Sequence, residues 1–138
     1  MNKEFTAEEL KKLTAEVIGA AMEVHRALGP GLLESSYGLC LARELGLRGI
    51  TFEREVPVPL RYKGVTLDCG YRADIVVAQT LLFELKAIET LLPIHEAQLI
   101  SYLKLTGCKV GLLINFNVQL LKHGIRRPVV GLNEGITL

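Results

Sequence analysis

Three ionisable residues in the middle of the chain, Asp74, Glu84 and Lys86, have a spacing that suits chemistry on a β-hairpin. Side chains of a strand alternate between its two faces, so Glu84 and Lys86 point the same way and Leu85 points the opposite way. A turn centred on Gln79 would place Asp74 opposite Glu84, with their Cβ atoms ~5 Å apart. Two carboxylates at that separation repel, and both stay ionised only if a cation lies between them.

The oxygen donors of Asp74 and Glu84 suit Mg²⁺ or Mn²⁺, ions that usually keep part of their water and recruit substrate phosphate. Lys86 could hold a metal-activated water or stabilise a phosphoryl oxygen during nucleophilic attack. The pattern therefore predicts a metal-dependent hydrolase.

An ordinary explanation stays open beside this one. Glu84 and Lys86 could form an ion pair on a solvated face of the strand, with Asp74 paired to Arg72 or Arg54. Exposed pairs of this kind are common and contribute only ~0–1 kcal/mol to stability.

Two further polar pairs lie on predicted helices that flank the hairpin. Glu34 and Tyr37 are three residues apart, which places both on one face of a helix that precedes it. Gln98 and Tyr102 are four residues apart on a helix that follows it, and they form a polar seam beside an apolar side. Taken alone, the second pair is also what the half-buried edge of any helix would show.

The apolar pattern predicts two helices before the hairpin. The first begins near Thr6, whose spacing to Glu9 is that of a capping box, and Gly29-Pro30 stops it. The second is expected from Leu32 to Leu45, ending at Gly46. The apolar stripe expected along the first helix consists of Leu10, Leu13, Val17, Ala21, Val24 and Leu28.

After these two helices, the spacing of the apolar residues changes from that of a helix to that of a strand. VPVPLRY (residues 56–62) predicts an edge strand, because its prolines lack an N–H, and Lys63-Gly64 predicts a tight turn. Residues 78–80 predict the turn into LLFELKA. A helix is expected over residues 93–105 with its end at Gly107, and KVGLLINF reads as a strand covered on both faces. A turn at His123-Gly124 and one last strand complete a single α/β domain, residues 1–138, with a mixed sheet.

The bulk properties narrow the class of protein. The chain has 138 residues, 49% of them hydrophobic, and a net charge of +1, which gives no support to affinity for nucleic acid along the whole sequence. Lys122, Arg126 and Arg127 form a local basic cluster that could contact phosphates or simply be solvated. Three cysteines without CxxC spacing, no apolar segment long enough for a bilayer and a polar start predict a cytoplasmic protein. A mean hydropathy of +0.30 suggests a homodimer.

The runs HRALGPGLLESSY, GYRADIVV, LLFELKAIE, HEAQLISYLKLTG and VGLLINFNV resemble the GxxExxY family, over about residues 13–130. That family is similar to the PD-(D/E)xK nuclease superfamily, particularly its RecB-like branch with a Q-x-x-x-Y helix. One position departs from the superfamily pattern, because Ala73 precedes Asp74 where a proline is usual. Proline there shapes the backbone and donates nothing to a metal, so every ionisable position of the pattern is still filled.

The resemblance implies a restriction-endonuclease-like core, a mixed β-sheet flanked by helices in α-β-β-β-α-β order. It implies that Glu34, Asp74, Glu84 and the backbone carbonyl of Leu85 are ligands of Mg²⁺ or Mn²⁺, and that Asp74, Glu84 and Lys86 are catalytic. Tyr37, Gln98 and Tyr102 would be substrate-contacting or supporting residues.

The sequence leaves three functions open. The first is a Mg²⁺-dependent nuclease, with DNA favoured over RNA by analogy alone. The second is a non-catalytic module that binds protein or nucleic acid and retains a nuclease-like fold. Hydrolysis of a small phosphodiester or nucleotide would use the same residues.

Overall fold

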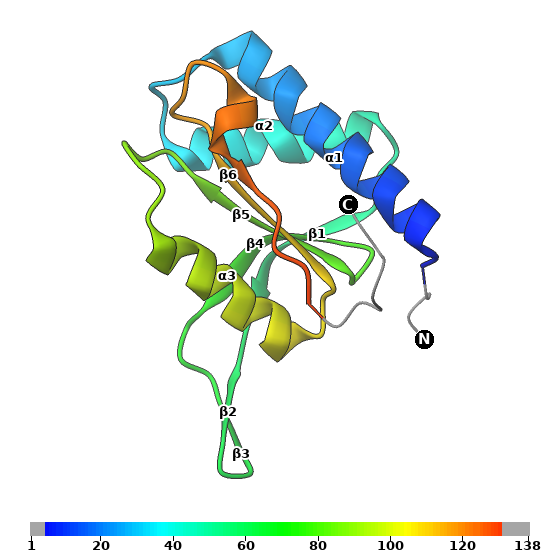
Figure 1. Ribbon diagram of the computed structural model, residues 1–138, viewed down its shortest axis with the longest axis vertical. Coiled ribbons are helices and arrows are strands. Elements are labelled where there is room, and N and C mark those ends of the chain that lie inside the picture. Colours follow the sequence, from blue (N-terminus) through cyan, green and yellow to red (C-terminus); the bar gives the residue numbers. More distant parts are fainter. Residues whose placement is uncertain (1–4, 131–138) are drawn as a thin grey trace.

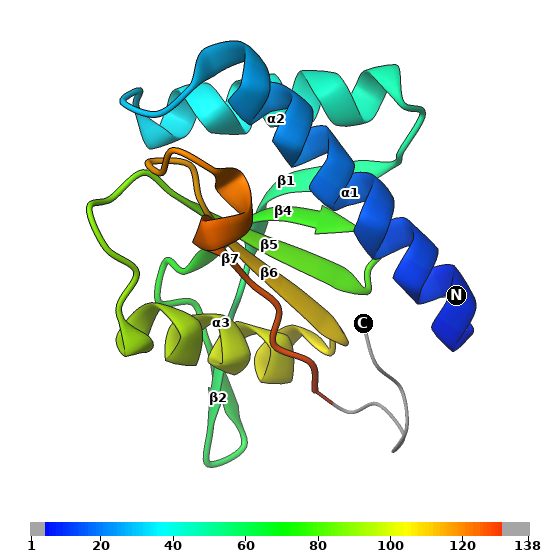
Figure 2. The ribbon, with the colours of Figure 1, turned by 45° about the horizontal axis from the view of Figure 1, so that its top comes forward.

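The computed structural model describes residues 5–130, which form a five-stranded mixed sheet between two layers of helices. The strand order is β1-β4-β5-β6-β7, with β5 and β6 parallel and the other neighbours antiparallel. Helices α1 and α2 cover one face and α3 covers the other (Figures 1 and 2). The elements are α1 (Ala7–Leu28), α2 (Glu34–Leu47), β1 (Phe52–Pro57), β2 (Leu60–Tyr62), β3 (Val65–Leu67), β4 (Arg72–Val77), β5 (Leu81–Lys86), α3 (Pro93–Thr106), β6 (Val110–Asn115), the 3₁₀ helix η1 (Leu121–Gly124) and β7 (Ile125–Arg126).

Helix α1 begins and ends where the sequence predicts. Its N-cap Thr6 accepts a hydrogen bond from the Glu9 N–H, and Gly29 ends it with φ +69°. Helix α2 begins at Glu34 and runs to Leu47, so the prediction of a start at Leu32 is wrong. The reason is local: Leu33 is extended, which makes it the N-cap.

Most of the predicted stripe of α1 lies in the core. Leu10, Val17, Ala21 and Val24 are buried, whereas Leu28, in the last turn, is 37% exposed and lies outside it. The stripe packs with α2 against one face of the sheet, and the opposite face forms a second cluster with α3.

The hairpin of β4 and β5 has the predicted register. Ile75 pairs with Phe83 and Val77 with Leu81, which centres the turn on Gln79. Three residues, 78–80, connect the strands: Ala78 and Gln79 both have positive φ, 53° and 55°, and the Thr80 N–H donates to the Val77 carbonyl at 3.1 Å, which makes the turn tight. Counted away from the turn, the last pair of the ladder is Ile75 with Phe83, so Asp74 and Glu84 are the next residues beyond its end.

The segment predicted as one edge strand is instead divided. β1 ends at Pro57 as the edge of the main sheet, and β2 begins at Leu60 as half of a separate two-stranded ribbon with β3. Two prolines explain the break, because neither can donate to a ladder. Val58 between them is buried and donates its N–H to the Tyr71 carbonyl at 2.9 Å, which closes the base of the ribbon.

The last predicted elements are confirmed. α3 ends at Gly107, whose φ of +80° is left-handed, and every residue of β6 is buried. The final turn is η1, followed by the short strand β7. Within residues 5–130, none of the helices combines the length and apolar character that crossing a membrane requires.

Candidate active site

Asp74 and Glu84 lie next to each other where the pairing of β4 with β5 ends. Asp74 Oδ2 accepts the backbone N–H of Leu85 at 2.7 Å, so a side-chain hydrogen bond joins β4 to β5 beyond the last backbone pair of the ladder. The carboxyl groups of Asp74 and Glu84 lie close enough for Asp74 to raise the pKa of Glu84. Glu84 is only 7% exposed, and its Oε1 is buried without a hydrogen-bond partner. The predicted pairing of the two carboxyl groups is therefore present.

Burial and the neighbouring Asp74 raise the pKa of Glu84 to about 9, and the ammonium group of Lys86 opposes this only in part. Glu84 consequently keeps its proton at neutral pH when no cation is bound. A proton thus fills the position between the two carboxyl groups that a divalent cation would take. A buried oxygen without a partner beside a second carboxylate is the donor set that Mg²⁺ or Mn²⁺ prefers, so these residues fit such an ion.

Lys86 lies at the end of β5, half-buried, in register with Asn115 of β6. Burial raises the pKa of both Glu34 and Glu84, and the nearby Lys86 ammonium group opposes that rise in each. In the described part of the chain no ion pair joins Glu84 to Lys86, and Arg72 is paired with Asp68 at 3.5 Å instead of Asp74. The alternative of a solvated ion pair is therefore wrong for Glu84.

Glu34, the first residue of α2, approaches the same site from the other layer. Lost hydration raises the pKa of its carboxyl group, Lys86 lowers it, and Asp74 raises it again. The backbone N–H of Ala87, directly after β5, also lowers the pKa of Glu34. Among residues 5–130, however, no group of three or more His, Cys, Asp or Glu side chains is close enough to hold a metal ion. The three carboxylates share a neighbourhood but do not converge on one point.

A pocket of about 150 Å³ opens beside these carboxylates. Asp74 and Glu34 line it together with the apolar side chain of Leu85. Arg54 and Glu55 of β1 also line it, and the sequence arguments gave neither a role in the site. Arg54 is the only cationic side chain among the lining residues, which makes it a natural contact for a substrate phosphate.

The predicted pair on α3 faces the site. Gln98 Nε2 donates to the Tyr102 hydroxyl at 3.3 Å, and Tyr102 is 6% exposed. Burial raises the pKa of the Tyr102 hydroxyl, with a further contribution from the nearby Glu84. The ring of Tyr71, which precedes β4, lies 5.9 Å from that of Tyr102, centroid to centroid.

Tyr37 lies in the core and lines no part of the pocket. It is fully buried and stacks on Phe116 at 4.5 Å, centroid to centroid. Its hydroxyl donates to the Gly29 carbonyl and accepts the Leu32 N–H, which holds the loop that leads to Glu34. This position allows a supporting role and no substrate contact.

Asn115 was not among the predicted site residues. It is buried, its Oδ1 accepts the Ile88 N–H at 3.1 Å, and its Nδ2 donates to the Ile88 carbonyl at 2.9 Å. These bonds fix the backbone that leaves β5 just after Lys86 and Ala87. A single amide in the apolar run KVGLLINF is the sequence signal that could have identified it.

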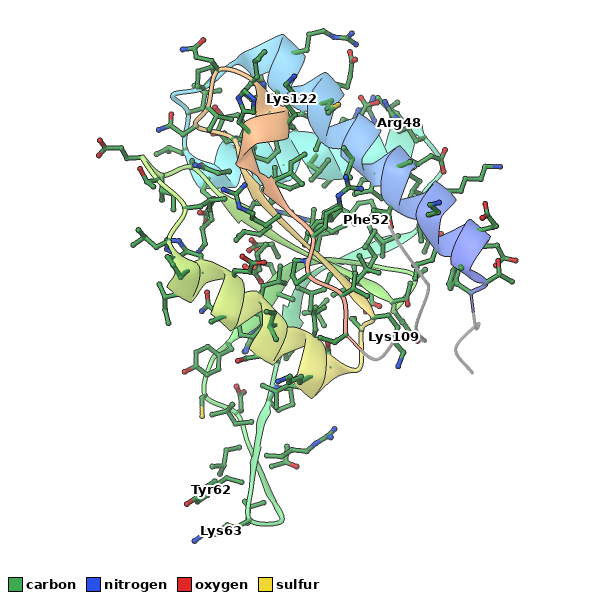
Figure 3. All side chains as sticks on the ribbon, viewed as in Figure 1. Arg48, Phe52, Tyr62, Lys63, Lys109 and Lys122 are labelled. Carbon is green, nitrogen blue, oxygen red and sulfur yellow. The ribbon has the colours of Figure 1, made fainter. Side chains whose placement is uncertain are left out.

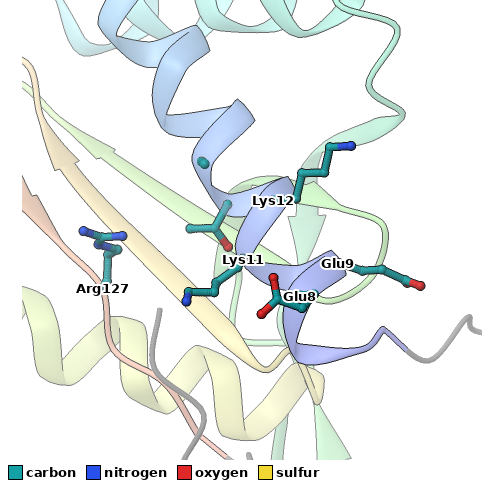
Figure 4. Close-up of a pocket in the computed structure, with 7 residues that line it drawn as sticks. Glu8, Glu9, Lys11, Lys12 and Arg127 are labelled. Atoms are coloured by element: carbon teal, nitrogen blue, oxygen red, sulfur yellow. The ribbon is translucent and has the colours of Figure 1, made fainter.

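The histidines lie elsewhere. His95 accepts the Leu92 N–H at 2.9 Å as part of the cap of α3, and His25 bonds to the Val118 carbonyl at 2.7 Å. A larger hollow, of about 640 Å³, lies at the start of α1, where Lys11 points toward Arg127 (Figure 4). It contains none of the candidate site residues.

One comparison with known proteins gives a match. The family model described as the PD-(D/E)XK nuclease superfamily matches residues 11–128, a span that includes every candidate site residue. No curated protein and no solved structure matches the chain.

Proposed function

This chain belongs to the PD-(D/E)XK nuclease superfamily, and on that premise we propose that it is a divalent-metal-dependent nuclease. The observation that carries the proposal is the close approach of Asp74 to Glu84, with a buried oxygen of Glu84 that has no hydrogen-bond partner and with Lys86 nearby. Burial of two carboxyl groups costs stability, because both lose their hydration. A functional site explains why the chain keeps such a pair.

The proposed roles follow from these positions. Asp74, Glu84 and the backbone carbonyl of Leu85 would hold Mg²⁺ or Mn²⁺, with Glu34 at the edge of the same site. When bound, the cation polarises a phosphoryl oxygen and lowers the pKa of coordinated water. The Lys86 ammonium group orients the attacking water and donates to the developing negative charge on the phosphoryl group. Arg54 binds an oxygen of the substrate phosphate at the mouth of the pocket.

Nucleic acid is the proposed substrate, and DNA is placed before RNA by family analogy alone. The test is to incubate the protein with end-labelled single- and double-stranded DNA and RNA in Mg²⁺, Mn²⁺ or EDTA. We expect cleavage that EDTA abolishes and that Glu84→Ala and Lys86→Ala remove, with Lys104→Ala, an exposed lysine of α3, as the control.

Two outcomes would contradict this proposal. Metal-dependent cleavage that survives in both Glu84→Ala and Lys86→Ala would remove these residues from the mechanism. A response of the melting temperature to Mn²⁺, with no cleavage of any substrate, would favour a binding module that retains the metal site.

A further inference from the structure

The ribbon of β2 and β3, residues 60–67, projects from the body of the molecule beyond α3 (Figure 1). It pairs with no strand of the main sheet within residues 5–130. An isolated two-stranded hairpin is marginally stable in water because it buries little apolar surface. A projecting ribbon of this kind therefore gains stability when something covers it.

The two faces of the ribbon differ in chemistry. Leu60 is opposite Leu67 and Tyr62 is opposite Val65, so all four side chains lie on one face. Tyr62, Val65 and Leu67 are 64%, 54% and 44% exposed. Arg61, which is opposite Thr66, lies on the other face.

Two cations lie on the ribbon, Arg61 within β2 and Lys63 at the tip, and no described residue forms an ion pair with either. Lys63 occupies the turn beside Tyr62 (Figure 3), with its Nζ 5.4 Å from the centroid of the Tyr62 ring. In the described part of the chain, neither Arg61 nor Lys63 has an ion-pair partner, and the nearby Asp68 is paired with Arg72. The ribbon thus offers an exposed aromatic ring with the Lys63 charge beside it and the Arg61 charge on the opposite face.

The base of the ribbon leads directly to the carboxyl pair. Tyr71 and Arg72 follow the ribbon in the chain, and Asp74 comes two residues later on β4. The ring of Tyr71 is 40% exposed and lies against Tyr102, the α3 residue beside Glu84. A ligand that lay along the ribbon toward its base would arrive at the candidate active site.

We propose that this ribbon is a binding arm for a single-stranded segment of nucleic acid, which it leads toward the carboxyl pair of Asp74 and Glu84. This proposal rests on the proposed nuclease function and specifies a single-stranded segment as the substrate. Phosphates bind Arg61 and Lys63, and an unpaired base stacks on Tyr62 against the apolar side chains next to it. A duplex hides the faces of its bases and would leave Tyr62 unused. A second copy of this chain would cover the apolar face and leave both cations unused.

The test measures binding without cleavage. Fluorescence anisotropy with a 5′-labelled single-stranded oligonucleotide and its duplex, both in EDTA, is recorded for four proteins: wild type, Tyr62→Ala, Arg61→Gln/Lys63→Gln and Lys11→Gln/Lys12→Gln. The last is the matched control, because it removes two cations from an exposed surface at the start of α1. Circular dichroism and the melting temperature verify that each variant is folded.

We expect wild type to bind the single strand more tightly than the duplex. Tyr62→Ala weakens binding of the single strand roughly tenfold. Arg61→Gln/Lys63→Gln reduces the slope of log K against log salt by about 1.4, since each phosphate contact to a single strand contributes ~0.7. The control pair leaves affinity and slope unchanged.

Three results would contradict the proposal that the ribbon is a binding arm. These are unchanged affinity in both ribbon variants, equal losses in the control pair, or tighter binding of the duplex than of the single strand. If Tyr62→Ala changes the molecular mass measured by light scattering and leaves nucleic-acid binding intact, the ribbon would be a dimer interface instead. Ribbon-dependent binding by a wild-type protein that cleaves nothing would count against the nuclease function and not against the arm.

Discussion

The carboxylate of Asp74 accepts the backbone N–H of Leu85 at 2.7 Å and so links the ends of β4 and β5 at the residue after Glu84. The hydrogen bond keeps the two strands together where their ladder stops. It also orients Asp74 toward Glu84 before any ligand binds, and the predictions below test what this arrangement does.

Replacing Lys86 should remove catalysis and leave substrate binding. We expect Lys86→Ala to lower kcat by about 10²–10³-fold with little change in KM, the range seen when one donor to developing charge is removed. The measurement is steady-state cleavage of a labelled oligonucleotide in Mg²⁺. An equal loss in Lys104→Ala, on the outer side of α3, would show that charge in general and not this position is responsible.

Glu84 should make the metal-free protein less stable as the pH rises. Its pKa is about 9 in the folded state and 4.5 without the fold, so between these values the folded state holds a proton that the unfolded state has lost. The free energy of unfolding therefore falls from about pH 4.5 to about pH 9, and the contribution of this group is fully favourable only below the lower value.

Glu84→Gln, which cannot ionise, should abolish this pH dependence. At pH 8 in EDTA we expect its melting temperature to exceed that of wild type by roughly 5 °C or more, and the difference to shrink at pH 5. Glu53→Gln, on the exposed edge strand β1, is the control. Parallel curves for wild type and Glu84→Gln from pH 5 to pH 9 would refute the raised pKa.

A divalent cation should stabilise the protein by replacing the proton that the carboxyl pair holds. Mg²⁺ or Mn²⁺ is expected to raise the melting temperature, and to do so more at pH 8 than at pH 6, because Glu84 must lose its proton to bind the ion. EDTA reverses the effect, and Asp74→Asn removes it. A shift of the same size in Asp74→Asn would place the ion elsewhere.

The hydroxyl of Tyr37 should matter for stability. Tyr37→Phe leaves the Gly29 carbonyl and the Leu32 N–H without that partner, which should lower the free energy of unfolding by about 1–3 kcal/mol in urea denaturation. Tyr62→Phe, on the exposed ribbon, is the matched control and should have no effect. A loss equal in both variants would contradict the role of the buried hydroxyl.

Local patterns predicted much of the fold. The register of β4 and β5 follows from the strand alternation and a short turn at residues 78–80, and the ends of α1 and α3 follow from Gly29 and Gly107. The start of α2 was placed two residues early because the apolar residues before Glu34 fit a helical pattern, although Leu33 is extended.

The site was predictable in its residue types and not in its electrostatics. The burial of Glu84 depends on α3 packing over that face of the sheet, a long-range contact that a strand pattern does not contain. The tight turn at Lys63-Gly64 is confirmed, but the separation of its ribbon from the main sheet is not predicted, for a related reason. Alternation in VPVPLRY continues through both prolines, and only the structure shows that the strand leaves the sheet between them.

The short turn of residues 78–80 has a consequence for how the chain folds. A hairpin closed by so short a loop costs little chain entropy and can form early, whereas β6 reaches β5 only after α3 has been placed. Asp74 and Glu84 belong to that hairpin, and Glu34 comes from a separate helix. The reactive pair should therefore be assembled in the folding transition state, so mutations in the turn should slow folding and leave the unfolding rate nearly constant.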